Sequence, residues 1–221
     1  MIDEGDRLLV GVSGGKDSTT LLYALLERQA RSPVHYELLP VHIDPGFEGG
    51  CAEALQQRCR KLGIELRVEY TDYGLQGHSP ENRENPCFLC ARLRRKRLFE
   101  IAHETGCRKI ALGHNKDDII DTFFMNICYA GEVSTMQPAQ SFFKGLFTLI
   151  RPLAFADEGT IRRFFNRMGF TAFENPCPSA KHSKRREIKD LLNQLYRGNP
   201  KVKGNIFRAM RNVRMEYMLK P

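Results

Sequence analysis

A short glycine-containing loop, SGGKDS at residues 13–18, constrains this chain more than any other feature of its sequence. The apolar run Arg7–Val12 before it predicts a β-strand, and the Leu- and Ala-rich stretch Thr19–Arg28 after it predicts a helix. At such a strand-to-helix turn, backbone N–H groups and the helix N-terminus together bind anionic oxygens. Glycines let a phosphate approach the backbone closely, and a lysine supplies a positive charge. The loop therefore predicts a phosphate site.

This loop differs from the two commonest nucleotide-binding loops. Val10 stands where a Walker A loop has its first glycine, and Asp17 stands where that loop has Ser or Thr. The spacing does not match the dinucleotide-binding fingerprint either. A glycine turn with an incidental lysine is the alternative, but the strand–loop–helix context favours a nucleotide. The candidate nucleotide-binding residues are Ser13, Gly14, Gly15, Lys16, Asp17 and Ser18.

The alternation of strand and helix patterns continues along the chain. Further strands are expected at Glu37–Ile43, Glu65–Tyr70 and Lys109–Gly113. Further helices are expected at Cys51–Leu62, Phe88–Thr105 and Asp117–Tyr129. This alternation is typical of a doubly wound α/β fold with a parallel sheet.

The second half of the chain has a different pattern. Residues 71–86 predict a polar loop, and residues 131–153 predict a hairpin or an irregular strand pair. Helical periodicity then returns at Asp157–Met168, Lys184–Tyr196 and Pro200–Met218. We therefore expect an α/β domain at residues 1–153 and a small helical appendage at residues 154–221.

Polar residues stand at the ends of two expected strands, where open α/β sheets bind their ligands. His42 and Asp44 end the second strand, and the segment GHNKDD at residues 113–118 ends the fourth. Carboxylates in that segment could hold Mg²⁺ against phosphates, or could only cap the helix that follows. The additional candidates are therefore His42, Asp44, Gly113, His114, Asp117 and Asp118.

The charge of the chain favours a polyanionic partner. Its 221 residues include 34 Lys and Arg against 26 Asp and Glu, a formal net charge of +8. No apolar run approaches the ~20 residues that span a bilayer, and the first residues are acidic, unlike a signal peptide. We expect a cytoplasmic protein without a membrane partner. Seven cysteines, an odd number, argue against a disulfide framework.

Three of the cysteines are candidate metal ligands. Cys87 and Cys90 form a CxxC pair at an expected helix start, and Cys177 lies in a proline-flanked loop. These thiols could bind zinc with His78 or His182, or hold a [4Fe–4S] cluster with one open iron. A thiol–disulfide or persulfide pair, with Cys87 or Cys177 as the sulfur carrier, is a third alternative. The remaining four cysteines lie in helix patterns or at a helix end, as small buried or incidental residues do.

Basic residues follow both cysteine segments. Five cations occur within residues 92–97, and a second group lies within residues 181–186. We expect these residues to form nucleic-acid phosphate-binding surfaces rather than helix faces that are only solvated. Arg94 stands four residues after Cys90 and should point back along its helix towards the candidate metal ligands. There it could assist catalysis instead of binding a nucleic-acid backbone.

The loop and the later segments also carry a family resemblance. SGGKDS after the first strand resembles the pyrophosphate-loop (PP-loop) ATPases, whose HUP-like, Rossmann-type domains split ATP between its α and β phosphates. The order of segments DRLLVGVSGGKDS, PCFLCARLRR, LGHNKDDIIDT and IRPL, followed by a late cysteine and a helical tail, resembles the tRNA 2-thiocytidine synthetases. This resemblance covers nearly the whole chain.

The resemblance implies an ATP-dependent enzyme that thiolates C2 of a cytidine in the tRNA anticodon loop. It implies a [4Fe–4S] cluster on Cys87, Cys90 and Cys177, and resemblance to the family's GHxxDD segment favours Asp117 and Asp118 in the site, where they could hold Mg²⁺ beside ATP. With the cysteines, Asp117 and Arg94 are the residues expected to be catalytic. The sulfur donor would be a cysteine desulfurase or free sulfide, and a homodimer is one expected assembly. Pro178 stands after Cys177 where relatives have glycine, and an N-terminal helix common in relatives is not among these residues. A lysidine-synthetase-like tRNA ligase and a non-catalytic ATP- or zinc-binding protein that docks on RNA are the alternatives.

Overall fold

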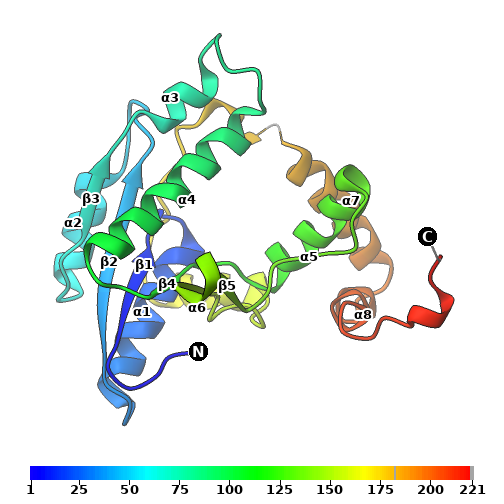
Figure 1. Cartoon of the computed structure of the whole chain (residues 1–221), viewed down its shortest axis with the longest axis horizontal. Helices are drawn as coiled ribbons and strands as arrows, with labels where there is room; N and C mark the ends of the chain where they lie inside the picture. Colours follow the sequence, from blue (N-terminus) through cyan, green and yellow to red (C-terminus); the bar gives the residue numbers. More distant parts are fainter. Residues whose placement is uncertain (182, 220–221) are drawn as a thin grey trace. The chain divides into compact units, whose positions relative to one another are not determined.

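A computed structural model describes residues 1–181 and 183–219 of the chain (Figure 1). The chain divides into two compact units, each described here by itself. The first contains Met1–Asn115 and Gln137–Ala180, and the second contains Lys116–Met136 and the C-terminal stretch from Lys181. Within the described residues, no helix combines the length and the apolar character needed to cross a membrane.

One sheet organises the first unit. Its strands are β1 (Asp6–Gly11), β2 (Tyr36–Asp44), β3 (Arg67–Tyr70), β4 (Lys109–Ala111), β5 (Ala139–Phe142) and β6 (Phe147–Ile150). They lie in the order β3-β2-β1-β4-β6-β5, and all neighbouring pairs are parallel except the β5–β6 hairpin. The predicted α/β fold with a doubly wound parallel sheet is confirmed.

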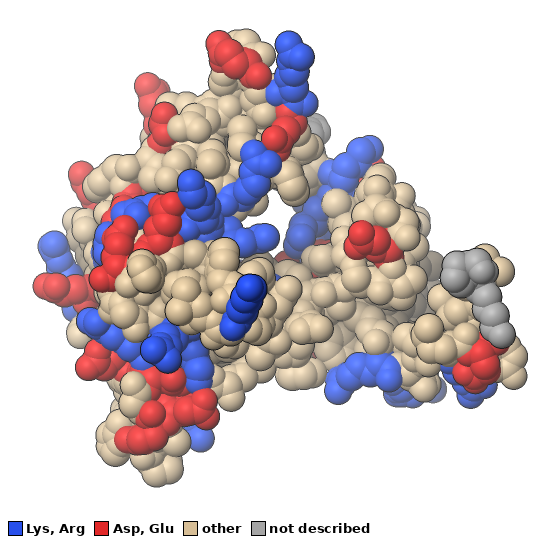
Figure 2. Space-filling model, viewed as in Figure 1, with Lys and Arg blue, Asp and Glu red and all other residues tan. Residues whose placement is uncertain are grey.

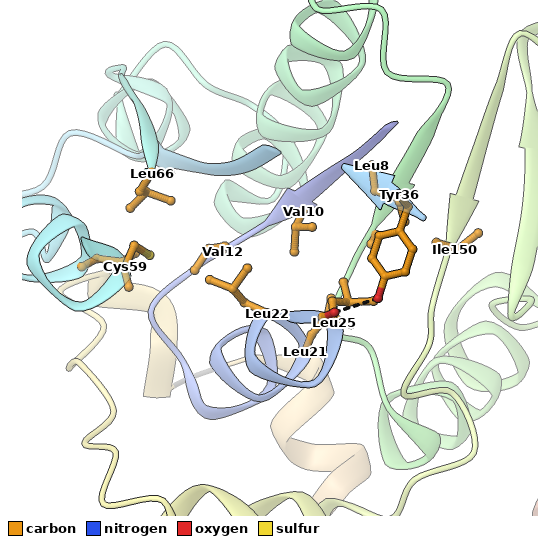
Figure 3. Packing of buried hydrophobic residues seen from close by; sticks show 12 residues of the cluster. Leu8, Val10, Val12, Leu21, Leu22, Leu25, Tyr36, Cys59, Leu66 and Ile150 are labelled. Carbon is orange, nitrogen blue, oxygen red and sulfur yellow. Dashed lines mark hydrogen bonds between the residues drawn. The ribbon is translucent and has the colours of Figure 1, made fainter. Parts of the chain in front are cut away.

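Helices cover both faces of this sheet. They are α1 (Lys16–Arg31), α2 (Ala52–Lys61), α3 (Tyr73–His78), α4 (Pro86–Glu104) and α6 (Glu158–Arg167). Side chains alternate along β1, so Leu8 and Val10 pack towards α1 while Leu9 packs towards α4. Figure 3 shows the α1 side, where the Tyr36 hydroxyl donates a hydrogen bond of 2.7 Å to the Leu25 carbonyl.

Two expectations about local structure were wrong. The expected loop at residues 71–86 contains the short helix α3, in which Gly74 and Gly77 allow Phe47 and Pro86 to approach the backbone. The last expected helix, Pro200–Met218, stops at Ala209, and a separate 3-10 turn forms at Met215–Tyr217.

The second unit is helical. It contains α5 (Lys116–Met125) with a π-helical extension at Asn126–Ala130, α7 (Lys184–Gly198) and α8 (Lys201–Ala209). Ile120, Ile188 and Leu192 form its buried centre. The division differs from the sequence-based boundary between residues 153 and 154. Helix α6 belongs to the sheet unit because Phe164 packs against Tyr23 of α1, whereas α5 joins the C-terminal helices.

Candidate active site

The SGGKDS loop joins β1 to α1 and is held closed by its own serines. The Ser13 N–H donates to Ser18 Oγ at 3.0 Å, and the Ser18 hydroxyl donates to the Gly15 carbonyl at 3.2 Å. Helix α1 begins at Lys16, and its N-cap, Gly15, has no side chain to satisfy the N–H groups of the first turn. These N–H groups and the helix dipole favour an anion at this point.

At two positions around the loop, other parts of the chain come so close to the backbone that only glycine fits. Gly14 has a φ of +81°, and a Cβ there would lie 3.0 Å from Cys51 Sγ. A Cβ at Gly113 would lie 2.9 Å from the backbone nitrogen of Ser18. Gly113 follows β4, so its missing side chain lets the end of β4 pack directly against the first turn of α1.

Lys16 is held by two carboxylates. Its ammonium group lies 2.9 Å from Asp17 and 3.1 Å from Glu158 at the start of α6. Burial lowers the pKa of Lys16, but the two carboxylates outweigh this and raise it above its ordinary value, so the lysine stays charged. Asn115, buried after β4, donates to Asp17 at 3.0 Å.

Asn115 and Glu158 were missing from the sequence-based site. Glu158 carries no local signal, because it lies far along the chain in an ordinary amphipathic helix. Asn115 stood inside the GHNKDD segment but lacked the charge that singled out its neighbours.

A cavity of about 180 Å³ opens beside the loop. Its lining residues include Ser13 and Gly15 of the loop, His42 and Asp44 at the end of β2, and Arg94 of α4. His42 Nδ1 lies 2.8 Å from the Val12 carbonyl, so the ring donates there. Burial lowers the pKa of His42 and keeps the imidazole neutral. The structure thus brings the loop, His42, Asp44 and Arg94 together around one cavity.

The two cysteines of the CxxC pair lie in the first turns of α4. Asn85 caps this helix by accepting hydrogen bonds from the N–H groups of Cys87, at 3.0 Å, and Phe88, at 3.3 Å. Burial raises the pKa of both Cys87 and Cys90, and the charge of Cys177 raises each further. Cys177 therefore lies close enough to interact with both. In the opposite direction, a hydrogen bond from Ser179 lowers the pKa of Cys87.

Three thiols that repel one another as thiolates are a donor set suited to a shared cationic centre. Among the described residues, no group of three or more His, Cys, Asp or Glu side chains already has metal-ligand spacing. To bind a single metal ion, the sulfur atoms would therefore have to move closer together.

The two candidate histidine ligands for zinc, His78 and His182, give no support to a zinc site. Both ring nitrogens of His78 are engaged: Nδ1 donates to the Gly74 carbonyl at 2.8 Å, and Nε2 lies 2.8 Å from Ser179 Oγ. His182 lies outside the described residues.

Arg94 connects the cysteines with the cavity. It lines the cavity together with Ser13 and Gly15, and its charge lowers the pKa of Cys90. Its Nε is buried without a hydrogen-bond partner in the described part of the chain. A buried guanidinium nitrogen without a partner favours an anionic ligand.

The residues of the GHNKDD segment fall in different units. Gly113 and His114 follow β4 in the sheet unit, whereas Asp117 and Asp118 begin α5 in the second unit. There Lys203 lies 2.7 Å from Asp117, and Arg185 lies 3.5 Å from Asp118. Both carboxylates are therefore engaged by cations of the C-terminal helices.

The basic run of α4 is less free than its sequence indicated. Arg97 pairs with Glu69 at 2.7 Å and with Glu104 at 2.6 Å, and Lys96 lies 3.7 Å from Glu100. Figure 2 shows the resulting mixture of basic and acidic side chains over α4. Arg97 thus stabilises the fold, and a phosphate-binding surface over the whole run is not supported.

The fold and the loop define this chain as an α/β nucleotide-binding protein of the PP-loop class. A family model described as a PP-loop domain matches residues 3–195. The tRNA-cytidine(32) 2-sulfurtransferase of Geotalea daltonii is 37% identical, with 99% of this chain and 88% of the relative covered. That of Alkalilimnicola ehrlichii is 39% identical, with 99% and 70% covered. The chain belongs to this tRNA-cytidine(32) 2-sulfurtransferase family of PP-loop proteins, which confirms the resemblance inferred from its motifs.

Solved structures agree with this assignment. The U34-tRNA thiolase NcsA from Methanococcus maripaludis with its [4Fe–4S] cluster has a TM-score of 0.79 at 26% identity, with 99% of this chain and 74% of that chain covered. The NH3-dependent NAD synthetase from Campylobacter jejuni has a TM-score of 0.52 at 16% identity, with 97% and 89% covered. The second likeness concerns the fold alone.

Proposed function

We propose that this protein is an ATP-dependent tRNA sulfurtransferase that replaces the 2-carbonyl oxygen of an anticodon-loop cytidine with sulfur. In this reaction the base oxygen attacks the α-phosphate of ATP, a C–O–P linkage forms and pyrophosphate leaves. A sulfur nucleophile then attacks C2, and AMP departs with the former base oxygen. Adenylation comes first because the unactivated oxygen is too poor a leaving group.

One observation carries the proposal: Arg94 lies next to both the nucleotide cavity and the cysteine pair. It lines the cavity beside Ser13 and Gly15 of the phosphate loop, and its charge acts on Cys90. A base activated at the loop therefore needs to move little to meet sulfur at the cysteines. Proximity of this kind removes much of the entropic barrier to a two-step reaction.

At the nucleotide end, the chain supplies a preorganised anion site. The first-turn N–H groups of α1 and the charged Lys16 would bind the phosphates and stabilise the charge that grows as pyrophosphate leaves. His42, buried and neutral, would line the nucleotide cavity as a polar side chain. Mg²⁺ at Asp117 or Asp118 is a further part of the proposal, and it requires Lys203 or Arg185 to release its carboxylate.

At the sulfur end, Cys87, Cys90 and Cys177 would hold a [4Fe–4S] cluster. When bound, such a cluster supplies an iron without a protein ligand, on which sulfide can be carried. Asn85 fixes the start of α4 and Ser179 hydrogen-bonds to Cys87, so the chain orients these thiols from two segments. The sulfur itself would come from a cysteine desulfurase or from free sulfide.

The proposal is tested by incubating anaerobically prepared protein with tRNA, ATP and sulfide. 2-Thiocytidine in the digested tRNA and AMP in solution are measured by mass spectrometry and chromatography. We expect Cys87→Ala, Cys90→Ala and Cys177→Ala each to abolish 2-thiocytidine while ATP binding survives. Cys128→Ala is the matched control, because Cys128 is an exposed cysteine of the helical unit.

Different failures have different meanings. Full thiolation by all three cysteine variants contradicts the role given to the cluster. Incorporation of lysine instead of sulfur identifies a lysidine-synthetase-like ligase. Absence of pyrophosphate release with any tRNA points to a non-catalytic nucleotide-binding protein.

A further inference from the structure

Helix α4 presents two neighbouring faces with different chemistry. Cys87, Cys90 and Arg94 follow one another at helical spacings of three and four residues and form the site face. Phe88, Arg92 and Arg95 follow the same spacings about a quarter turn away. All three residues of this second stripe are exposed. The stripe therefore borders the cysteines along the first half of the helix.

Phe88 stands out within this stripe. Its side chain is 61% exposed, although it lies in a capped first turn where a polar residue would form the helix equally well. The Arg92 guanidinium lies 5.7 Å from the centre of its ring, and Glu84 holds that guanidinium at 3.1 Å. An exposed aromatic ring beside a tethered guanidinium is the combination on which unpaired bases stack.

We infer that Phe88 is a stacking platform for an unpaired RNA base next to the reacting cytidine. The inference rests on the proposed RNA substrate and adds the residue that positions it. When the reacting base lies over the site face, the neighbouring base of the same RNA strand reaches the adjacent stripe that contains Phe88. Arg92 and Arg95 then lie beside the phosphates that join the two nucleotides. The partner is single-stranded RNA, because a paired base cannot offer its face to the ring.

The absence of tryptophan from the chain gives a direct test. Phe88→Trp introduces a single tryptophan, which can be excited selectively, at the proposed platform, and Phe143→Trp introduces one elsewhere. Phe143 is matched in exposure, at 64% against 61%. It lies in the β5–β6 turn, at the amino end of β6, whereas the phosphate loop follows the carboxyl end of the parallel strand β1. Each variant is titrated with an RNA hairpin whose loop contains the cytidine, and with a fully paired RNA duplex.

We expect the hairpin to quench Phe88→Trp, with little effect of the duplex and none of either RNA on Phe143→Trp. Phe88→Ala should raise the KM for tRNA about 5- to 100-fold, while the KM for ATP stays unchanged. Phe88→Tyr should restore the KM for tRNA, because stacking needs a ring and not a particular side chain. Recovery by tyrosine separates stacking from a general loss of helix stability.

Two results would overturn the inference. One is equal quenching of Phe88→Trp by hairpin and duplex, and the other is an unchanged KM for tRNA in Phe88→Ala. If either result is found and the wild-type protein still thiolates tRNA, the stacking role of Phe88 is rejected and the proposed function stands. If the wild-type protein neither binds nor modifies tRNA, the proposed function fails first.

Discussion

At the scale of single residues, the phosphate loop could be predicted because its signal is contiguous in the sequence. Its ion-pair partner Glu158 could not, since the pair with Lys16 forms only when α6 packs on α1. The basic run of α4 shows the reverse case. Five neighbouring cations indicated a phosphate surface, but Glu69 of β3 pairs with Arg97 from another element, and Glu104 pairs with it from the end of α4 itself. Partners distant in sequence decide whether a charge is available.

Lys16 should matter for ATP more than any other lysine of the sheet unit. Lys16→Met keeps most of the side-chain volume and removes the charge beside the loop. We expect the affinity for ATP to fall about 10- to 100-fold, as loss of a charged hydrogen bond predicts. Isothermal titration calorimetry measures this, with Lys144→Met in the β5–β6 turn as control. Equal affinities for ATP in the two variants would remove Lys16 from the site.

Arg94 should matter for chemistry more than for binding. Arg94→Met is expected to lower kcat for thiolation at least about tenfold while iron content stays unchanged. Lys96→Met, two residues along the same helix, is the control, because Lys96 is exposed and paired with Glu100. A tRNA thiolation time course separates the variants. An unchanged kcat in Arg94→Met would show that this arginine only lines the cavity and has no part in catalysis.

At the scale of elements, the order of strands and helices in the sheet could be predicted, because hydrophobic periodicity and glycine signals are local. Helix α3 could not, since its glycines favour a loop, and the close contacts that Phe47 and Pro86 make at Gly74 and Gly77 come from outside the helix. The contact of β4 with α1 was equally hidden. It depends on Gly113, whose importance is steric rather than chemical.

Gly113→Ala tests that contact. The new Cβ would lie 2.9 Å from the backbone of α1, which cannot move without shifting the phosphate loop. We expect a destabilisation of about 1–3 kcal/mol together with weaker ATP binding. Gly159→Ala in α6, whose Cβ would meet nothing closer than 3.8 Å, should be neutral or stabilising by about 0.5–1 kcal/mol. Thermal unfolding of both variants checks this, and equal melting temperatures would contradict it.

At the scale of the whole molecule, the helical unit has a pH-dependent stability of its own. Burial raises the pKa of Asp121 in α5 from 3.8 to about 6, and the nearby carboxylates Asp118 and Asp117 add to this. Between these two values the folded protein holds a proton that the unfolded chain has lost. The free energy of unfolding therefore falls as pH rises through that window.

Asp121→Asn should abolish this dependence. We expect the variant to be more stable than the wild type by about 1–3 kcal/mol near neutral pH, and the difference to shrink towards about pH 4. Urea unfolding followed by circular dichroism at several pH values measures it. A constant difference across the range would show that the Asp121 carboxyl is not the group responsible.

The measurement that tests the central claim most directly is the metal content of protein purified without oxygen. If three cysteines from two segments form one iron–sulfur site beside the nucleotide cavity, the protein must carry a complete cluster. We therefore expect about four irons and four acid-labile sulfides per chain, lost in Cys177→Ala and retained in Cys128→Ala. Zinc alone would contradict this prediction and make the cysteines a structural site, and iron retained in Cys177→Ala would contradict it by removing Cys177 from the ligands.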